Sequence, residues 1–429
     1  MLHLQSTPTA VRRLSLERIL SKQSLPRFVP LQSAPMWNGC GRPTAIHDCV
    51  IVKHRARQVI SAIRTLENQL RLYSWRVDAQ GVAVCTGATD AQMTDVAQVS
   101  LVRAQKYISG CRTFQGQIQL RCWDVSNTGV LYASGPATAL AAGYTWLQLL
   151  VLAPDRLLTI GLTTDGQWHL TTWSITEENV LLQMRTVTMP ATTGAIAAAL
   201  LDPVQISPAT ATPVAQTGPI SFLTARQSDA QEVKWTHWHC SPDGGLTVYR
   251  ETALALTAVI DLALTTVNGE PVTLIHYVDG RLQALYGWPS TDQEWGPETA
   301  TDTLQQSLGS RLVTLSDEVR LFSLTHDLHQ LTVAYITTMS TGAQNVCTPA
   351  SIGAPSSPEV TTVQMHRWHS TAQQWVADGE GIIPIATATE LTLCNQPLDG
   401  NAPFLTAICT AAGMLHLVTW SDTFQNQFN

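Results

Sequence analysis

Charged side chains are scarce in this sequence of 429 residues, since Asp, Glu, Lys and Arg together make up 13% of it, against about 25% in typical domains. Neutral polar residues such as Thr, Gln and Ser are abundant instead. A surface of neutral hydrogen-bonding groups suits strand edges and sheet faces. Hydrophobic residues make up 45% of the chain, which is ample for a large core.

The sequence also lacks a disulfide framework and a membrane segment. Its nine cysteines form no CxxC pair and no regular spacing. An odd number without a framework is typical of a reducing compartment. The N-terminus lacks the charged-then-apolar layout of a secretory signal, and no stretch is apolar and long enough to span a bilayer. We therefore expect a soluble, cytoplasmic protein that does not bind membranes.

A short phrase ending in tryptophan recurs about every fifty residues. Its first copy, residues 70–75, reads Leu-Arg-Leu-Tyr-Ser-Trp, and a looser copy with one extra residue is 282–288. A second pattern, Ile-Ser-x-x-Arg-Thr, ends ten residues before the first two tryptophans. Two patterns at a fixed separation indicate a true repeat. The seven copies end at Trp75, Trp123, Trp173, Trp238, Trp288, Trp368 and Trp420.

The unit contains short stretches rich in β-branched residues, separated by turn residues. Four such strands in each of seven units predict an all-β fold. We expect a seven-bladed β-propeller of four-stranded antiparallel blades over residues 47–429. The recurrent tryptophans are expected to be structural and to fill the wedges between blades, because packing needs a similar residue in every unit.

Residues 1–46 stand outside the repeat and form a predicted N-terminal extension. Residues 9–22 have the pattern of a short amphipathic helix. The chain ends nine residues after Trp420, too soon for a fourth strand in the last blade. Because an open ring would leave an exposed sheet edge, we expect residues 27–32 to supply that strand and close the ring.

Charge is distributed unevenly along the chain. Residues 1–77 carry twelve Lys or Arg and three Asp or Glu, whereas the remainder carries thirteen basic and twenty-nine acidic residues. This basic head either folds back on the acidic body or meets an acidic partner, and its dispersed charges favour the first. No nucleic-acid partner is expected, because the body offers no continuous basic track.

The Ile-Ser-x-x-Arg-Thr strand followed by the Trp-ended strand resembles a loosely defined group of bacterial seven-bladed propellers, over about residues 47–423. True WD40 repeats are different, because Trp123-Asp124 is the only Trp-Asp pair and no blade begins with Gly-His. Kelch repeats are different too, because Gly244-Gly245 stands alone. The resemblance implies a propeller fold and a bacterial source, and it supplies no catalytic residues.

Local motifs of catalysis or metal binding are missing. His237 and His239 share one face of a strand beside Cys240, but no further ligand is evident nearby, so no metal site is predicted. No Gly-x-Ser-x-Gly elbow, P-loop or His-Glu-x-x-His occurs. We therefore predict no catalytic residues, no cofactor and a non-enzymatic role.

Three hypotheses of function follow. The first is a protein-binding scaffold within a larger complex, which binds where the repeat is interrupted: residues 1–46, 203–213 and 339–359. The second is a carbohydrate-binding propeller whose tryptophan rings stack on sugars. The third is an enzyme with a site at the channel mouth, which an inward cluster of His, Arg and carboxylates would favour. The partner-binding residues predicted by the first are Arg12, Arg13, Leu16, Arg18, Leu20, Asn345, Val346 and Ile352.

Overall fold

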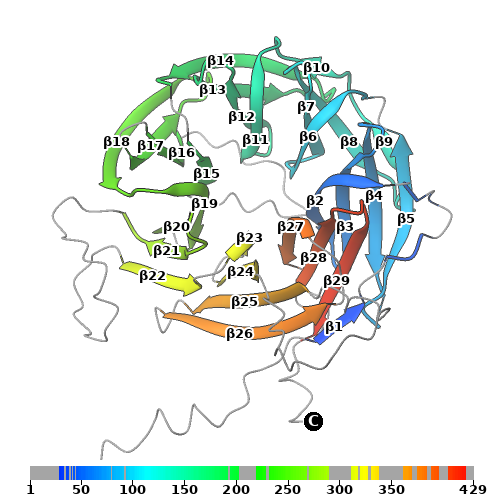
Figure 1. Cartoon of the computed structure of the whole chain (residues 1–429). Coiled ribbons are helices and arrows are strands. Elements are labelled where there is room, and N and C mark those ends of the chain that lie inside the picture. The colour runs from blue at the N-terminus through cyan, green and yellow to red at the C-terminus, as the bar shows by residue number, and fades with distance from the viewer. Residues whose placement is uncertain are drawn as a thin grey trace, which may run out of the picture.

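The structure is a computed structural model. It describes residues 29–32, 35–37, 40, 42–43, 45–78, 80–90, 93–191, 194–201, 219–228, 231–267, 270–288, 311–316, 319–326, 330–337, 361–369, 374–383, 388–395 and 404–421. All regular elements in these ranges are β-strands, arranged in a ring of radial sheets (Figure 1). Among these residues no helix is long and apolar enough to cross a membrane. The fold is an all-β propeller, as predicted.

Strands that follow one another in the chain pair antiparallel within each sheet. The first three sheets contain β2 (Ile46–Arg55), β3 (Gln58–Thr65), β4 (Leu70–Val77) and β5 (Ala83–Asp90); β6 (Val96–Arg103), β7 (Tyr107–Thr113), β8 (Ile118–Val125), β9 (Leu131–Ala133) and β10 (Thr138–Ala139); and β11 (Tyr144–Ala153), β12 (Arg156–Thr163), β13 (Trp168–Ile175) and β14 (Leu181–Met189). The next two contain β15 (Ile196–Leu200), β16 (Ile220–Gln227), β17 (Glu232–Cys240) and β18 (Leu246–Ala255); and β19 (Val259–Val267), β20 (Glu270–Tyr277), β21 (Leu282–Tyr286) and β22 (Arg311–Ser316). The last two contain β23 (Val319–His326), β24 (Gln330–Thr337), β25 (Thr361–His369) and β26 (Gln374–Ile383); and β27 (Ala388–Asn395), β28 (Phe404–Thr410), β29 (Leu415–Ser421) and β1 (Val29–Gln32).

The first strand of each sheet lies nearest the axis of the ring. Neighbouring first strands contact one another in a closed circle, β2, β6, β11, β15, β19, β23, β27 and back to β2. Six sheets have four strands and one has five, so the prediction of four-stranded blades is right for six. In the five-stranded sheet the outer strand is divided into β9 and β10, which both pair with β8. The break includes Pro136, which has no N–H to donate to a ladder.

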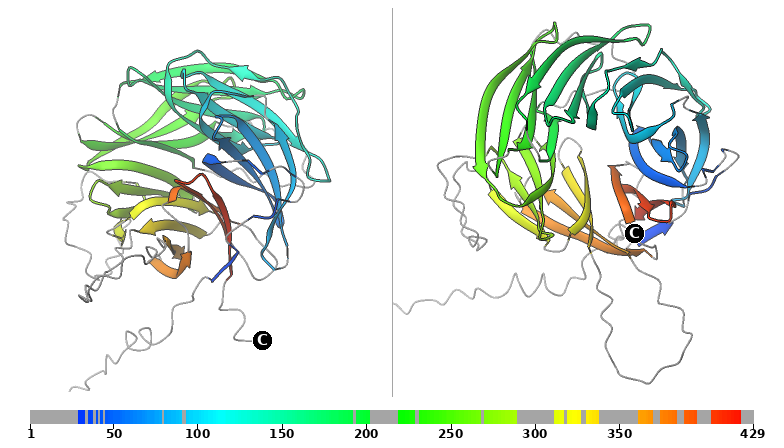
Figure 2. Two further views of the ribbon diagram at one scale, coloured as in Figure 1. Left: turned by 45° about the vertical axis from the view of Figure 1, so that its right-hand side comes forward. Right: turned by 45° about the horizontal axis from the view of Figure 1, so that its top comes forward.

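The N-terminal segment closes the ring. Strand β1 pairs antiparallel with β29, with Val29 opposite Ser421, which confirms the predicted closing strand for Val29–Gln32 (Figure 2). Farther along, Met36 bonds to the outer strand of the first sheet, since its N–H donates to the Ala83 carbonyl at 2.8 Å. We call residues 29–40 the closing segment and the junction of the first and last sheets the seam. The predicted helix at 9–22 lies outside the described residues.

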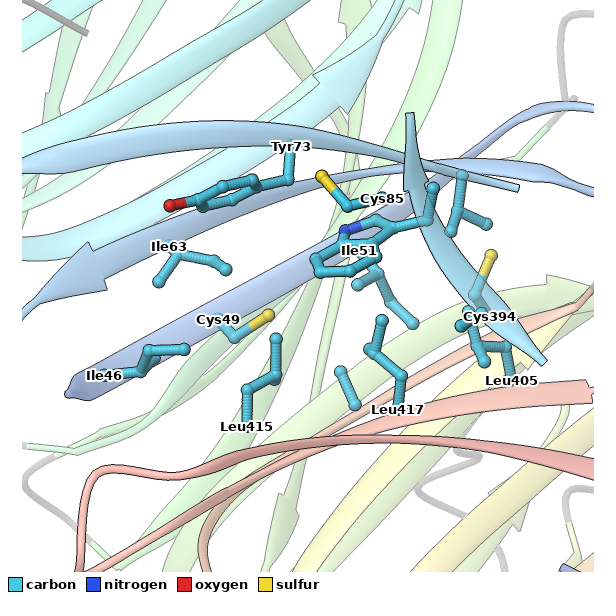
Figure 3. Packing of buried hydrophobic residues seen from close by; sticks show 14 of the residues in the cluster. Ile46, Cys49, Ile51, Ile63, Tyr73, Cys85, Cys394, Leu405, Leu415 and Leu417 are labelled. Atoms are coloured by element: carbon cyan, nitrogen blue, oxygen red, sulfur yellow. The ribbon is translucent and has the colours of Figure 1, made fainter. Parts of the chain in front are cut away.

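Hydrophobic clusters fill the spaces between neighbouring sheets. The cluster at the seam joins Cys49 and Tyr73 of the first sheet to Leu405 and Leu417 of the last (Figure 3). Each residue of β28 is buried, because a middle strand is covered on both faces by adjacent sheets. The ring therefore depends on contacts between sheets, as well as on the ladders within them.

Five recurrent tryptophans share one hydrogen bond. Each is fully or almost fully buried, and its indole N–H donates to a Ser or Thr hydroxyl fourteen residues earlier, on the preceding strand. Because a buried donor needs a partner, the small hydroxyl residue recurs with the tryptophan. The pairs are Trp75–Ser61 and Trp123–Ser109 at 2.8 Å, Trp238–Thr224 and Trp420–Thr406 at 3.0 Å, and Trp173–Thr159 at 3.1 Å.

A second recurrent bond joins neighbouring sheets, and we call it the latch. The residue before a recurrent tryptophan donates its hydroxyl to the carbonyl of a turn glycine in the next sheet. The three latches are Ser74–Gly129 at 2.6 Å, Thr172–Gly244 at 2.9 Å and Thr419–Gly81 at 2.6 Å. Gly244 has a positive φ of 82°, and a Cβ there would come within 2.7 Å of Thr172 Oγ1, so the turn requires glycine.

Candidate functional site

The repeat changes most at Trp288. Because of the extra residue in its phrase, Trp288 lies two positions beyond the end of β21, and it is only half-buried. Thr273 is close to the position of the hydroxyl partner in this sheet, yet it accepts its bond from Trp235 of the preceding sheet, at 2.8 Å. Trp288 therefore does not fill a wedge as predicted. It lies at the edge of the neighbouring core cluster.

Trp288 contacts a group of half-buried and exposed side chains on the sheet of β15–β18. The His237 ring lies 5.8 Å from the Trp288 ring, and the Arg250 guanidinium lies 5.1 Å above that ring. Tyr249 stacks on His239 at 4.7 Å with an interplanar angle of 21°, and it meets His237 edge-on at 4.9 Å. We define the rim patch as His237, His239, Val248, Tyr249, Arg250 and Trp288.

The pairing of β17 with β18 explains this arrangement. His237 and His239 alternate along β17 with Trp238 and Cys240, which face the core. The register shifts between His237–Arg250 and Trp238–Val248, so Tyr249 is the extra residue of a β-bulge. The same shift occurs before Trp75 and Trp173, so the bulge belongs to the repeat, and in this sheet it re-aims the side chain of Tyr249. Tyr249 is 67% exposed and Val248 is 53% exposed, on the outermost strand of the sheet.

His237 occupies the latch position, immediately before Trp238. In this sheet the position holds an imidazole that packs against aromatic rings. Beside the patch, Lys234 forms ion pairs with Glu232 at 3.4 Å and with Glu251 at 3.9 Å. The positive charge of Lys234 is therefore balanced by two carboxylates, whereas the Arg250 guanidinium in the patch lies over an aromatic face.

The pattern His237, His239 and Cys240 does not assemble a metal site. The two imidazoles lie 5.0 Å apart on one face, whereas the Cys240 side chain is buried on the other. Burial raises the pKa of the Cys240 thiol and so disfavours the thiolate that a metal would need. Within the described ranges, no three His, Cys, Asp or Glu residues are grouped so that they could hold a metal ion.

A second group of polar residues lies near the axis, at the end where the inner strands begin. We call it the axial cluster: Asp48, Arg64, Gln98, Arg112, Asp261 and Glu390. Its four inner-strand members each follow a shift in register, which turns the side chain at the start of the strand. Arg64 and Arg112 lie opposite Asp48 and Gln98 on the second strands.

Two members of the axial cluster link neighbouring inner strands. Asp48 Oδ2 accepts a hydrogen bond from the Val99 N–H at 3.0 Å. Gln98 exchanges two bonds with Leu147, each 3.0 Å long, through its side-chain amide. These bonds join the first sheet to the second and the second to the third, so part of the cluster is structural.

The carboxyl groups of the axial cluster interact across the ring. Burial, with the charges of Asp48 and Asp261, raises the pKa of Glu390 to about 7 against the opposing effect of Arg64. Burial also raises the pKa values of Asp48 and Asp261. The side chains of Glu390 and Asp261 are exposed to solvent, so water partly screens the charges of these two carboxylates. Carboxylates from three sheets therefore lie near the axis, with Arg64 beside them.

The structure describes most of the recurrent tryptophans but none of the predicted partner-binding residues. All eight predicted partner-binding residues, with the segments 203–213 and 339–359, lie outside the described residues. Five of the recurrent tryptophans are buried with their N–H groups bonded, so they offer no ring face to a sugar. The side chain of Trp368 is outside the described part. Tyr249 and Arg250 were missed, and the extra residue before Trp288 was the available indication.

No protein-family model matches the chain. No curated protein matches it either. Among solved structures, AofleA from Arthrobotrys oligospora is similar, with 10% sequence identity and a TM-score of 0.46 over 80% of this chain and 88% of that one. The WD40 domain of SCAP from fission yeast is similar with 9% identity and a TM-score of 0.45, over 92% of this chain and 94% of that one. Sqt1 from Saccharomyces cerevisiae is similar with 10% identity and a TM-score of 0.46, over 92% of this chain and 99% of that one. These likenesses concern the β-propeller fold alone. The bacterial source and the repeat type stay predictions.

Proposed function

We propose that this protein is a non-catalytic cytoplasmic scaffold, a subunit that binds a partner protein on the rim patch. The observation that carries this proposal is the group formed by the exposed Tyr249 and Arg250 with the half-buried Trp288, supported by two histidines. Tyr, Trp and Arg are the residue types that contribute most binding energy at protein interfaces. The predicted N-terminal helix and the 339–359 loop are proposed as further contacts of the same complex.

The way in which the rings contact one another favours a protein over a glycan. A sugar stacks on an open aromatic face, but His237 and Arg250 lie against Trp288, and His239 lies against one face of Tyr249. What the patch presents is one open tyrosine face, a hydroxyl and a guanidinium. Such a mixed group suits the packed centre of a protein interface.

Strand β18 adds a main-chain element to this surface. It is the outermost strand of its sheet, so one edge pairs with no other described strand. An open edge of this kind accepts an extended segment of a partner through backbone hydrogen bonds, while neighbouring side chains supply specificity. Five of the six rim-patch residues lie on β17 and β18, so the side chains that would supply specificity lie beside the open edge.

The test is quantitative purification of the tagged full-length protein from its source cells, with Tyr249→Ala and Arg250→Ala variants. Recovery of a specific partner should fall by at least about tenfold, because a central interface residue commonly contributes 2 kcal/mol or more. Tyr132→Ala is the matched control, since Tyr132 is 49% exposed on another sheet. Equal recovery with all three variants, at unchanged melting temperatures, contradicts the proposal.

The axial cluster supports a second candidate, an enzyme or small-molecule site at the mouth of the ring. Glu390 has a pKa of about 7, and a general acid or base acts best when its pKa is near the working pH. A thermal-shift screen of small polar metabolites tests this candidate, with Glu390→Gln and Arg64→Ala as controls. A compound that stabilises only the unmodified protein supports it, and a screen without such a compound counts against it.

A further inference from the structure

Two pairs of thiols lie at the seam. Cys40 of the closing segment packs against the core cluster that contains Cys85 of β5, and Cys49 of β2 and Cys409 of β28 lie in that same cluster. Within each of these pairs the two thiols interact. All four cysteines are free thiols. Cys49 and Cys85 belong to the same core cluster, between the first and last sheets (Figure 3). Both pairs therefore join elements that must separate if the ring opens at this point.

The two pairs differ in access. Cys49 and Cys409 are both buried in the core, and so is Cys85. Cys40 is only half-buried and packs against the outside of the cluster. An oxidant in solution can therefore reach Cys40 without any opening of the ring, and Cys85 is the thiol next to it.

We propose that Cys40 and Cys85 are a redox modification site, at which a disulfide fastens the closing segment to the first sheet. The closing segment is already held there, because the N–H of Cys85 donates to the Met36 carbonyl at 2.8 Å. Trp37 packs edge-on against Tyr73 and Trp75, with ring centroids 5.0 and 4.8 Å away. The backbone therefore holds the two thiols together in the reduced protein.

A Cys40–Cys85 disulfide would also affect how the first and last sheets are connected. Strand β1 of the closing segment is the outer strand of the last sheet, paired with β29. A Cys40–Cys85 disulfide therefore ties the last sheet to the first through the covalent chain. In the reduced protein, the described contacts of Met36 and Trp37 with the first sheet are hydrogen bonds and aromatic packing.

A low-molecular-weight disulfide such as glutathione disulfide supplies the oxidising equivalents. The Cys40 thiolate attacks one sulfur of glutathione disulfide, forms a mixed disulfide and expels one glutathione thiolate. The Cys85 thiolate then attacks the Cys40 sulfur and expels the second glutathione thiolate. Two protein thiols lose two electrons, two glutathiones form, and the two thiol protons pass to them. Burial raises the pKa of Cys85, which makes the second step the slow one.

The test uses the full-length protein incubated with glutathione disulfide, then quenched, alkylated and digested. Mass spectrometry should find the Cys40–Cys85 peptide pair, and the melting temperature should rise by roughly 5 °C and return after reduction. Cys40→Ser should abolish both effects. Cys122→Ser, which removes a buried thiol in another cluster, should leave both unchanged.

Three outcomes would overturn the proposal. One is glutathione on Cys40 without any link to Cys85. Another is a Cys49–Cys409 link in place of the Cys40–Cys85 link. The third is the same rise in melting temperature in Cys40→Ser as in the unmodified protein.

Discussion

The indole–hydroxyl bond of the repeat makes a quantitative prediction at Thr406. In Thr406→Val the side chain keeps its shape but loses the oxygen that accepts the Trp420 N–H at 3.0 Å. Both residues are fully buried, so water cannot replace the lost partner. An unsatisfied buried donor costs about 1–3 kcal/mol. We expect the free energy of unfolding to fall by that amount.

The measurement is urea denaturation followed by circular dichroism, with a double-mutant cycle. Trp420→Phe removes the donor, so adding Thr406→Val to it should cost at least about 1 kcal/mol less than Thr406→Val alone. Thr332→Val is the comparison variant, because Thr332 is also buried in a middle strand and accepts no hydrogen bond from any tryptophan side chain that the structure describes. If the two substitutions are additive within about 0.5 kcal/mol, the bond does not stabilise the ring.

Two further predictions concern the axis and the seam. Glu390 has an ordinary pKa of 4.5 and a folded pKa of about 7, so the folded protein binds this proton more tightly. That stabilisation is present below pH 4.5 and is lost as the pH rises through about 7; Glu390→Gln should therefore flatten the fall in stability over this range, and an unchanged pH profile would contradict it. Deletion of residues 1–44 should lower the melting temperature in one cooperative transition, whereas a truncated protein that melts like the full chain would show that the closing segment is dispensable.

The fold could be predicted because its determinants recur. The spacing of Trp75, Trp123 and the later copies reports a packing need that each sheet shares, and the need of every blade for a fourth strand indicated the closing strand. What recurrence could not predict was the partner of each tryptophan. The serine of Ile-Ser-x-x-Arg-Thr was visible as a pattern, but its bond to the indole depends on the register between two strands.

The candidate site was harder to predict for the same reason. The rim patch joins the consecutive strands β17 and β18 to Trp288, which lies two residues beyond β21 in the next sheet and meets them through a contact between sheets. Trp288 looked like one more member of the repeat. Its single extra residue moved it out of the wedge, and only the structure shows that it then meets His237 and Arg250.

The central claim is that function lies where the repeat is broken, at the rim patch. Site-specific photo-crosslinking in source cells tests it most directly, with a photoreactive amino acid in place of Tyr249 and, separately, of Tyr132. We predict a discrete adduct with one partner protein from position 249 and none from position 132. No adduct at position 249, or the same adducts at both positions, would contradict the claim.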